Sequence, residues 1–410
     1  MVKEYIRCRL CAAGLEEILD FGETALANSY LKQADLQKPE FCAPLVVCKC
    51  RQCGCVQLKH TVSAEQLFKH YLYASSDSKA LRTHFERYAR TICEDRKLVA
   101  GDLCVDIGSN DGVLLEPFHK FGCRIVGIEP ASNLCIIANA KGLTTVEAFF
   151  GPDLATDLVR QFGHASVITC NNCFAHIDNL QGIVDGVNIL LKPDGVFVFE
   201  NAYWLDSVNG KYFDQIYHEH IFYHSLRPLR LFLNKNGLAI INVDRNEIQG
   251  GTIRVFCAKL SEHTKQQVLD LEEQEEHAGI YEAAFYATFK NDLNDLRSAL
   301  QEIIRIEKSK GKRFACYGAP AKATLLCKFF GLTNDLIDFV VDDAPMKQGL
   351  YMPETHIPIV SREQIETQKP DFIIIAAWNF STFIMAKNPD FNGRWIVPMP
   401  TIQTYDNSRI

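Results

Sequence analysis

The chain has 410 residues, of which 47% are hydrophobic and 23% charged, and its formal net charge is -7 at pH 7. At roughly 150 residues per domain this length predicts two to three domains, and the composition excludes disordered, fibrous and membrane-embedded classes. The mild acidic charge provides no basic field of the kind that nucleic-acid binding needs, so we expect no nucleic-acid partner.

Cysteines are unevenly distributed: the chain has 16, and seven of them precede residue 56. The charged first ten residues contain no apolar signal core. The longest apolar stretches, such as Phe372 to Trp378, fall far short of the roughly 20 residues that span a bilayer. We therefore expect a cytoplasmic protein without a membrane segment, in which clustered thiols indicate metal ligands before disulfides.

Residues 1–60 are predicted to form a small zinc-binding domain, because short segments with close cysteines suit a minidomain that a metal staples together. Two C-x2-C knuckles offer four thiolates for one tetrahedral, structural zinc ion: Cys8, Cys11, Cys50 and Cys53. Three neighbours compete as ligands and leave the third and fourth positions open: Cys42, Cys48 and Cys55. The alternative is a set of ordinary buried thiols.

Residues 61–235 are predicted to form a doubly wound α/β domain with a helical lead-in. Apolar residues recur at helical spacing from Thr61 to Lys97, interrupted by a polar loop, which indicates helix, loop, helix. Apolar runs then alternate with helical patterns, as expected of buried parallel strands. The predicted strands are Leu103 to Ile107, Arg124 to Ile128, Ser166 to Cys170 and Gly195 to Glu200.

Residues 236–410 are predicted to form a third domain with a second Rossmann-like sheet. It begins with a hairpin formed by Leu238 to Val243 and Gly251 to Ala258, followed by a long helix from Ser261 to about Lys310. Further strands are expected at Arg313 to Tyr317, Leu336 to Val341 and Phe372 to Ala376.

The strand predicted at 103–107 runs into a tight small-residue turn, Val105 to Gly112, where the backbone can approach a nucleotide-like ligand. Glu129 closes the next strand, about 20 residues further on, where a carboxylate can accept hydrogen bonds from both ribose hydroxyls. The turn lacks G-x-G-x-x-G spacing and resembles the S-adenosylmethionine site of class I methyltransferases; a Rossmann turn for NAD is the alternative. The candidate cofactor residues are Asp106, Gly108, Asn110, Gly112, Glu129, Asn171 and Asn172.

The segment Phe213 to His220 (Phe-Asp-Gln-Ile-Tyr-His-Glu-His) concentrates side chains that exchange protons or hydrogen bonds. The catalytic interpretation is a histidine general base, a carboxylate that orients its ring, and a phenol that hydrogen-bonds an enolate oxygen. Two alternatives remain open: a solvated polar loop, or a transition-metal site formed by His218, His220 and His224.

A second strand-to-helix glycine turn, Tyr317 to Lys322, carries a lysine in the first helical turn, and Lys347 adds a cation beyond the next strand. Phosphate binding is the functional interpretation. The alternative is a Rossmann-like domain that serves packing alone.

In this order the motifs resemble the sugar C-methyltransferases, in particular the nucleotide-sugar (dTDP-hexose) C-3 methyltransferases of deoxysugar biosynthesis. The motifs are the two cysteine knuckles, Val105 to Gly112, Phe213 to His220, Gly250 to Val255, Tyr317 to Lys322 and Lys347 to Gly349. The resemblance covers nearly the whole chain. It implies a zinc-binding domain, a central S-adenosylmethionine domain, a C-terminal Rossmann-like domain that helps hold the nucleotide, and a monomer.

The resemblance also implies roles for single residues. His220 is expected to be the base at C-3, Glu219 its neighbour and Tyr217 the donor to the keto oxygen. Further expected active-site residues are Tyr73, Asn172 and His176, and the expected substrate-binding residues are Tyr317, Gly318, Lys322 and Lys347.

Chemistry supports a keto sugar as substrate, because a carbon becomes nucleophilic here only when a neighbouring ketone makes its C–H acidic. We therefore expect C-3 methylation of an NDP-4-keto-6-deoxyhexose through an enolate. The competing functions are an O- or N-methyltransferase, a non-catalytic zinc-containing binding protein, and an NAD-dependent sugar reductase whose C-terminal unit would lack a full dinucleotide fingerprint.

Overall fold

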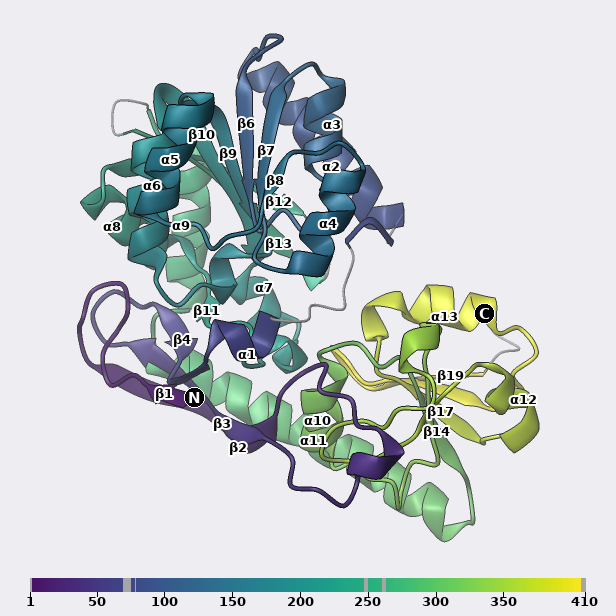
Figure 1. Cartoon of the computed structure of the whole chain (residues 1–410). Helices are drawn as coiled ribbons and strands as arrows, with labels where there is room; N and C mark the ends of the chain where they lie inside the picture. The colour runs from purple at the N-terminus through teal and green to yellow at the C-terminus, as the bar shows by residue number, and fades with distance from the viewer. Residues whose placement is uncertain (1, 69–74, 78, 247–249, 260–262, 407–410) are drawn as a thin grey trace.

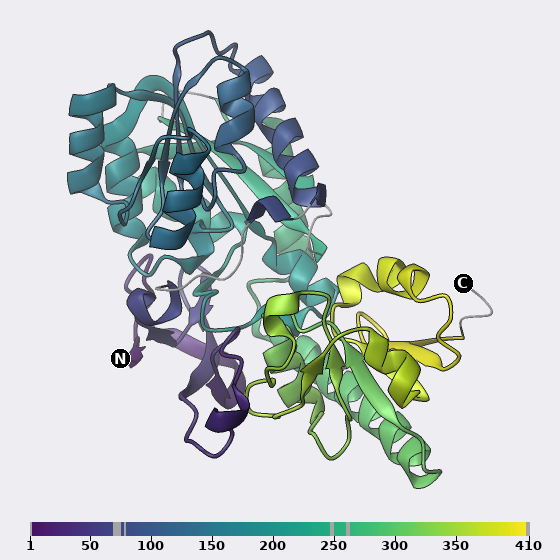
Figure 2. The ribbon, with the colours of Figure 1, turned by 45° about the vertical axis from the view of Figure 1, so that its right-hand side comes forward.

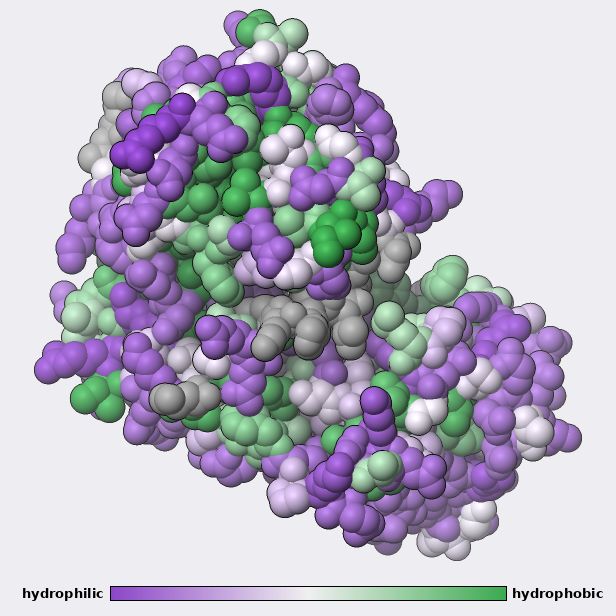
Figure 3. Space-filling view, viewed as in Figure 1, coloured by the Kyte–Doolittle hydropathy of each residue, from purple (hydrophilic) through white to green (hydrophobic). Residues whose placement is uncertain are grey.

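The computed structural model describes residues 2–68, 75–77, 79–246, 250–259 and 263–406. The chain forms an N-terminal, a central and a C-terminal unit, and the long helix α10 (Ala283–Ser309) runs beneath the central unit toward the C-terminal one (Figure 1). In the part of the chain that the structure describes, no helix is long and apolar enough to cross a membrane. Hydrophilic residues predominate on the face of the C-terminal unit that Figure 3 shows.

The N-terminal unit is built on a short antiparallel sheet in the order β11-β4-β3-β2. Its strands are β2 (Leu15–Ala25), β3 (Cys42–Cys50), β4 (Val56–Leu58) and β11 (Phe222–Tyr223), beside the separate pair β1 (Val2–Glu4) and β5 (His60–Val62). The edge strand β11 comes from the central part of the chain, directly after the segment 213–220. The candidate catalytic segment therefore leads directly into an edge strand of the zinc-binding unit.

The central unit contains a seven-stranded sheet in the order β12-β13-β10-β9-β6-β7-β8. Its strands are β6 (Leu103–Ile107), β7 (Arg124–Ile128), β8 (Thr145–Val146), β9 (Ala165–Asn171), β10 (Leu191–Ala202), β12 (Leu238–Asn246) and β13 (Thr252–Lys259). Strands β6 to β10 are parallel, and β13 runs antiparallel to β10. The predicted parallel strands are thus confirmed, with identical bounds for β6 and β7.

Helices cover both faces of this sheet (Figure 1). One face carries α2 (Lys79–Asp95), α3 (Leu115–Lys120) and α4 (Ser132–Ala140), and the other carries α5 (Pro152–Phe162), α6 (Leu180–Leu190) and α8 (Leu226–Lys235). The remaining short helices are α1 (Ala64–Phe68), α7 (Trp204–Asn209), η2 (Ser75–Asp77), η3 (Phe174–His176) and η4 (Phe213–Gln215).

The hairpin expected to open the C-terminal domain belongs instead to the central sheet. Strand β13 pairs with β10 from Phe197↔Cys257 to Ala202↔Thr252, and β12 covers the outer edge of β13. The sheet order therefore places β12 and β13 in the central unit, not in a domain that begins at residue 236. The physical reason is that β13 satisfies the backbone hydrogen bonds along the edge of β10.

The helical stretch expected from Ser261 to Lys310 is divided into α9 (Gln266–Ala278) and α10. Gly279 separates them, because it adopts a left-handed conformation at the end of α9 with φ +74°, as glycine C-caps do.

The C-terminal unit is a six-stranded sheet in the order β16-β15-β14-β17-β18-β19. Its strands are β14 (Phe314–Tyr317), β15 (Val340–Val341), β16 (Ile359–Val360), β17 (Phe372–Ile375), β18 (Arg394–Val397) and β19 (Gln403–Asp406), and its helices include α11 (Ala323–Phe330), α12 (Glu363–Gln368), α13 (Ser381–Lys387) and the short η7 (Trp378–Phe380). The strand order reverses between β14 and β17, where open α/β sheets bind ligands. Figure 2 shows this unit beside the N-terminal one, beneath the central sheet.

Candidate functional site

The two cysteine knuckles of the N-terminal unit converge on one point. Their sulfur atoms all lie within 4.8 Å of one another, with Cys8 Sγ 3.7 Å from Cys53 Sγ and Cys11 Sγ 3.4 Å from Cys50 Sγ. A tetrahedral zinc ion with Zn–S bonds of about 2.3 Å separates its sulfurs by about 3.8 Å, so this set fits the ion.

Backbone groups support these sulfurs as thiolates. The N–H of Leu10 lies 3.4 Å from Cys8 Sγ, and the N–H groups of Gln52 and Cys53 lie 3.4 and 3.5 Å from Cys50 Sγ. Hydrogen bonds to the charged form of a group favour that form. The competing thiols Cys42, Cys48 and Cys55 lie outside the set, so the site is closed by four cysteines and is structural rather than catalytic.

The turn after β6 is shaped by left-handed residues. Gly108 has φ +70°, Asn110 +51° and Gly112 +85°. A Cβ atom on Gly108 would lie 2.7 Å from Cys173 Sγ, and one on Gly112 would lie 2.4 Å from Leu143 Cδ1. Glycine is favoured at both positions, because the left-handed backbone strains any other L-residue and a new Cβ would force Cys173 or Leu143 to move.

Glu129 stands at the end of β7 against this turn. Its Oε2 accepts a hydrogen bond from the Asn110 N–H (2.8 Å) and its Oε1 one from the Ala131 N–H (2.9 Å). Burial raises the pKa of the Glu129 carboxyl, whereas these two backbone groups lower it. The carboxylate is held in one place at the sheet edge, as a ribose acceptor must be.

The neighbouring strand β9 ends in two asparagines. The buried Asn171 amide lies within hydrogen-bonding reach of the Tyr88 hydroxyl, and Asn172 adopts φ +50° while its N–H donates to the Glu200 carbonyl (2.7 Å). Both side-chain amides belong to the carboxyl end of β9, the edge of the sheet at which open α/β folds bind ligands. Together with the fixed Glu129 carboxylate, they fit the ribose and amino-acid groups of S-adenosylmethionine.

Asp106 lies within β6, just before the turn, and is buried beneath it. Its side chain is 4% exposed and accepts a hydrogen bond from Thr169 Oγ1 (2.6 Å), and burial raises the pKa of its carboxyl to about 7. Asp106 therefore links β6 to β9 beneath the edge where Glu129 and Asn171 lie.

Segments before α2 also reach the turn. The Ser75 N–H donates to Asn110 Oδ1 (2.9 Å) and the Ser76 N–H to Asp111 Oδ1 (3.3 Å). Tyr73, which we expected in the active site, lies outside the described residues.

A buried ionic network ties α2 to the ends of β10 and β13. Glu200 Oε1 lies 2.8 Å from His84 Nε2, Glu200 Oε2 accepts from Arg254 Nε (2.8 Å), and the Arg254 guanidinium lies 3.9 Å from the Tyr88 ring centroid. Burial alone would raise the pKa of the Glu200 carboxyl, but His84 and Arg254 hold it below its usual value. In the sequence Arg254 stands out only as part of a motif, because its partners lie in distant segments.

Three of the predicted catalytic side chains meet at His220. The ring of Tyr217 lies 4.0 Å and that of His176 4.8 Å from the His220 ring, measured between centroids. His220 Nδ1 lies 2.6 Å from the Gln215 carbonyl oxygen. Since a carbonyl only accepts hydrogen bonds, Nδ1 carries the proton and Nε2 the lone pair. Burial lowers the pKa of the His220 imidazole to about 4, so the ring is neutral at pH 7.

The other histidines of this region point elsewhere. His218 Nε2 hydrogen-bonds the Ala43 carbonyl (3.1 Å) in β3, and His224 packs among phenylalanine rings. Among the described residues only the four knuckle cysteines form a group with metal-ligand spacing. The alternative in which His218, His220 and His224 chelate a metal is therefore wrong.

Glu219 is the contact between the catalytic segment and the N-terminal unit. Asn28 Nδ2 donates to Glu219 Oε1 at 3.4 Å, and the Tyr30 hydroxyl donates to the Ala319 carbonyl (2.5 Å) in the C-terminal unit. Burial raises the pKa of the Glu219 carboxyl to about 7. Asn28 and Tyr30 carry no signal in the sequence, because no local pattern shows that residues 28–30 reach both other units.

The glycine turn of the C-terminal unit packs against β17. Gly318 has φ +94°, and a Cβ there would lie 2.6 Å from Ala377 Cβ. The Tyr317 hydroxyl donates to Asp343 Oδ1 (3.2 Å), and Lys347 Nζ donates to the Ala319 carbonyl (2.7 Å). Tyr317, Gly318 and Lys347 thus surround one turn at the carboxyl end of β14.

Lys322 lies on the other side of that turn, toward the catalytic segment. Its Nζ donates to Asn379 Oδ1 (2.9 Å), lies 4.1 Å from the Trp378 ring centroid and is 3.8 Å from Asp214 Oδ2. Each of the two predicted phosphate-binding lysines therefore has a carboxylate partner: Asp214 for Lys322 and, at 3.6 Å, Asp342 for Lys347.

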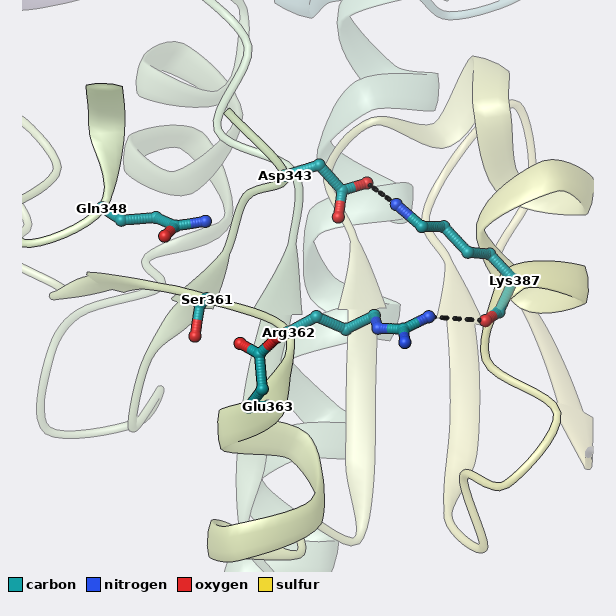
Figure 4. Close-up of a pocket in the computed structure, with 6 residues that line it drawn as sticks. All are labelled: Asp343, Gln348, Ser361, Arg362, Glu363 and Lys387. Atoms are coloured by element: carbon teal, nitrogen blue, oxygen red, sulfur yellow. Dashed lines mark hydrogen bonds and ion pairs between the residues drawn. The ribbon is translucent and has the colours of Figure 1, made fainter. Parts of the chain in front are cut away.

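A pocket of about 350 Å³ lies at the carboxyl ends of β15 and β16 (Figure 4). One ion pair and one side-chain to backbone hydrogen bond cross it: Lys387 Nζ lies 2.7 Å from Asp343 Oδ2, and Arg362 Nη1 donates to the Lys387 backbone carbonyl (2.9 Å). The Tyr317 hydroxyl, at the end of β14, donates a hydrogen bond to Asp343. The pocket therefore adjoins the glycine turn that follows β14.

The order of the central sheet, the turn with Glu129 and the four-cysteine site together define a zinc-containing methyltransferase that depends on S-adenosylmethionine. Three family profiles match successive parts of the chain: "Putative zinc binding domain" over residues 8–68, "Methyltransferase domain" over 73–243 and "C-methyltransferase C-terminal domain" over 247–400.

Curated relatives extend this result. The chain is 35% identical to "C-methyltransferase NovU" of Streptomyces niveus over 98% of its own length and 97% of that protein. It therefore belongs to the C-methyltransferase family. The "Ubiquinone biosynthesis O-methyltransferase" of Cupriavidus pinatubonensis (strain JMP 134 / LMG 1197) is 28% identical over 29% of this chain and 51% of that protein.

Among solved structures, magnesium protoporphyrin IX methyltransferase (ChlM) from Synechocystis PCC 6803 with bound SAM matches 43% of this chain and 79% of that chain, with 13% identity and a TM-score of 0.33.

Proposed function

We propose that this protein transfers a methyl group from S-adenosylmethionine to C-3 of a nucleotide-linked 4-keto-6-deoxyhexose, with dTDP as the preferred carrier, in deoxysugar biosynthesis. Membership of the C-methyltransferase family supports the transfer to carbon. The substrate class is supported by the resemblance of the segments 213–220 and 317–322 to sugar C-methyltransferases, and by the chemistry, because a 4-keto group acidifies the C-3 proton.

The observation that carries this proposal is the tautomer of His220. The Gln215 carbonyl fixes the proton on Nδ1, which leaves the Nε2 lone pair to remove a proton from C-3. Because burial holds the imidazole pKa at about 4, the ring need not lose a proton at pH 7 before it acts as a base.

The polar groups around His220 each have a role in the proposed reaction. Tyr217 donates a hydrogen bond to the keto oxygen as it becomes an enolate, and Glu219 and His176 complete the polar wall of the site. S-adenosylmethionine, when bound, supplies a methyl carbon that is electrophilic because it is attached to a sulfonium. The C-3–methyl bond forms as the sulfur–methyl bond breaks, sulfur keeps the electron pair, and His220 releases its proton to water.

The two ligands occupy different sheet edges in this proposal. The cofactor lies at the central sheet, against Asp106, Gly108, Asn110, Gly112, Glu129, Asn171 and Asn172. The nucleotide diphosphate lies toward the C-terminal unit, against Tyr317, Gly318, Lys322 and Lys347, where Lys347 offers an ammonium beside the glycine turn.

The test separates proton removal from methyl transfer. A panel of NDP-4-keto-6-deoxyhexoses is incubated in deuterated water without methyl donor, and then with it, and read by mass spectrometry. We expect exchange at C-3 and addition of one methyl group. His220→Asn should lose both by about 10²–10⁴-fold with S-adenosylmethionine affinity unchanged, whereas the exposed control His277→Asn should retain both.

Two results contradict the proposal. Wild-type exchange by His220→Asn would show that another group is the base. Methylation of an oxygen or nitrogen without any C-3 exchange would favour an O- or N-methyltransferase.

A further inference from the structure

A buried carboxylate connects the C-terminal unit to the catalytic segment. The Asp214 side chain is fully buried, its Oδ2 accepts a hydrogen bond from Trp378 Nε1 (2.7 Å), and Lys322 Nζ lies 3.8 Å from the same oxygen. A buried carboxylate is costly unless it is paired and hydrogen-bonded, so these two partners determine where Asp214 can be placed.

Both partners are themselves immobilised. The Trp378 ring stacks on Tyr212 at 4.3 Å with an interplanar angle of 16°, and the Lys322 ammonium lies over the same indole at 4.1 Å. Gly250 closes the third side, since a Cβ atom there would lie 3.1 Å from both Trp378 and Tyr212. The indole N–H is thus aimed at Asp214 by packing on three sides.

The residue that follows Asp214 provides the carbonyl that holds the proton of the proposed base. Asp214 and Gln215 form the last two residues of η4, and the Gln215 carbonyl accepts the His220 Nδ1 proton at 2.6 Å. Burial raises the pKa of the Asp214 carboxyl, while Lys322, Trp378 and the backbone N–H groups of Asp214 and Gln215 lower it. Asp214 therefore anchors η4 to the C-terminal unit at the residue directly before Gln215, whose carbonyl holds the His220 proton.

We propose that Asp214, held by Trp378 and Lys322 of the C-terminal unit, is a positioning residue that fixes the Gln215 carbonyl and thereby keeps the His220 proton on Nδ1. The C-terminal unit then acts on the central site through protein contacts, in addition to any nucleotide it binds. The role of His220 as a base rests on the proposed function, whereas its tautomer is a property of the protein alone.

The experiment measures that tautomer directly in the full-length, zinc-loaded protein. Histidine ring nitrogens are labelled with ¹⁵N and observed by long-range ¹H–¹⁵N correlation, and His220 is assigned from its absence in His220→Asn. Trp378→Phe preserves the stacking on Tyr212 and removes the N–H donor. Asp214→Asn preserves the volume and removes the charge. Trp395→Phe, a buried tryptophan on β18 that packs against Phe391, is the matched control.

We expect a single Nδ1–H form of His220 in the wild type and in Trp395→Phe, and a second, Nε2–H form in Trp378→Phe and Asp214→Asn. In the two variants C-3 exchange should fall at least tenfold, while the dissociation constant for S-adenosylmethionine changes less than twofold. A purely structural role would lower the melting temperature without creating the second tautomer.

An unchanged Nδ1–H form in both variants would overturn the proposal. Should Asp214→Asn fail to fold, Trp378→Phe decides alone, because it keeps the buried charge paired with Lys322. A change of tautomer together with an absence of C-3 exchange in the wild type would sustain the positioning role and refute the proposed function.

Discussion

Gly108→Ala is the substitution whose cost the structure defines most closely. Gly108 has φ +70°, a region that costs an L-residue roughly 1–2 kcal/mol. At about 2–4 °C per kcal/mol for a unit of this size, the backbone cost alone should lower the melting temperature by about 2–8 °C. The new Cβ would also lie 2.7 Å from Cys173 Sγ, which adds a steric cost and displaces the turn that we assign to the cofactor.

The two contributions can be separated with matched variants. Gly142→Ala carries the backbone cost alone, because Gly142 has φ +79° and nothing within 4 Å of its would-be Cβ. Gly108→Ala/Cys173→Ala removes the closest contact, keeps the strained φ and leaves the Cys173 Cβ 3.0 Å from the new Cβ. Calorimetry should rank Gly108→Ala as least stable, with the double variant between it and Gly142→Ala, and titration calorimetry should show S-adenosylmethionine affinity lost in Gly108→Ala and partly regained in the double variant. Equal stability and equal cofactor affinity of Gly108→Ala and Gly142→Ala would show that the close approach to Cys173 has no effect on either property.

Three further predictions concern single side chains. Burial raises the pKa of the Glu219 carboxyl to about 7, so folding stability falls as pH rises from about 4.5 to 7, where the unfolded chain ionises first. Relative to wild type, Glu219→Gln should gain up to about 3 kcal/mol between pH 4 and pH 8 in denaturant unfolding, and a parallel pH dependence would contradict this. Elemental analysis should detect zinc in Cys48→Ser and not in Cys11→Ser; zinc in both variants would place a different ligand in the site. Glu129→Ala should weaken S-adenosylmethionine binding by about 10- to 100-fold, the value of a charged hydrogen bond, with the exposed Glu147→Ala near wild type, and equal affinities would remove Glu129 from the ribose site.

Local features of the sequence were sufficient for several parts of the fold. The strands β6 and β7 follow from continuous apolar runs bounded by turn residues, because a strand buried on both faces has no polar alternation to obscure it. The glycine turn after β6 is equally local, since the left-handed conformations belong to residues within five positions of one another. The zinc knuckles are also read from spacing, because two cysteines separated by two residues present both sulfurs to one ion.

Long-range contacts determined the remaining strand pairings of the fold. Sequence spacing could not show that β13 would pair with β10, or that β11 would leave the central part of the chain to complete the zinc-binding sheet. In both cases the partner strands are far apart in sequence and the pairing depends on which sheet edges are left to cover.

The same distinction between local sequence and long-range contacts applies to the candidate catalytic site. The sequence by itself determined that His218, Glu219 and His220 are adjacent and can exchange protons, but adjacent side chains in an irregular segment point in different directions. Only the tertiary structure decided that His218 faces the Ala43 carbonyl, whereas His220 meets the Gln215 carbonyl beside Tyr217. It also placed Asp214 against Trp378, 164 residues away, because a buried charge is stable only where distant segments supply its partners.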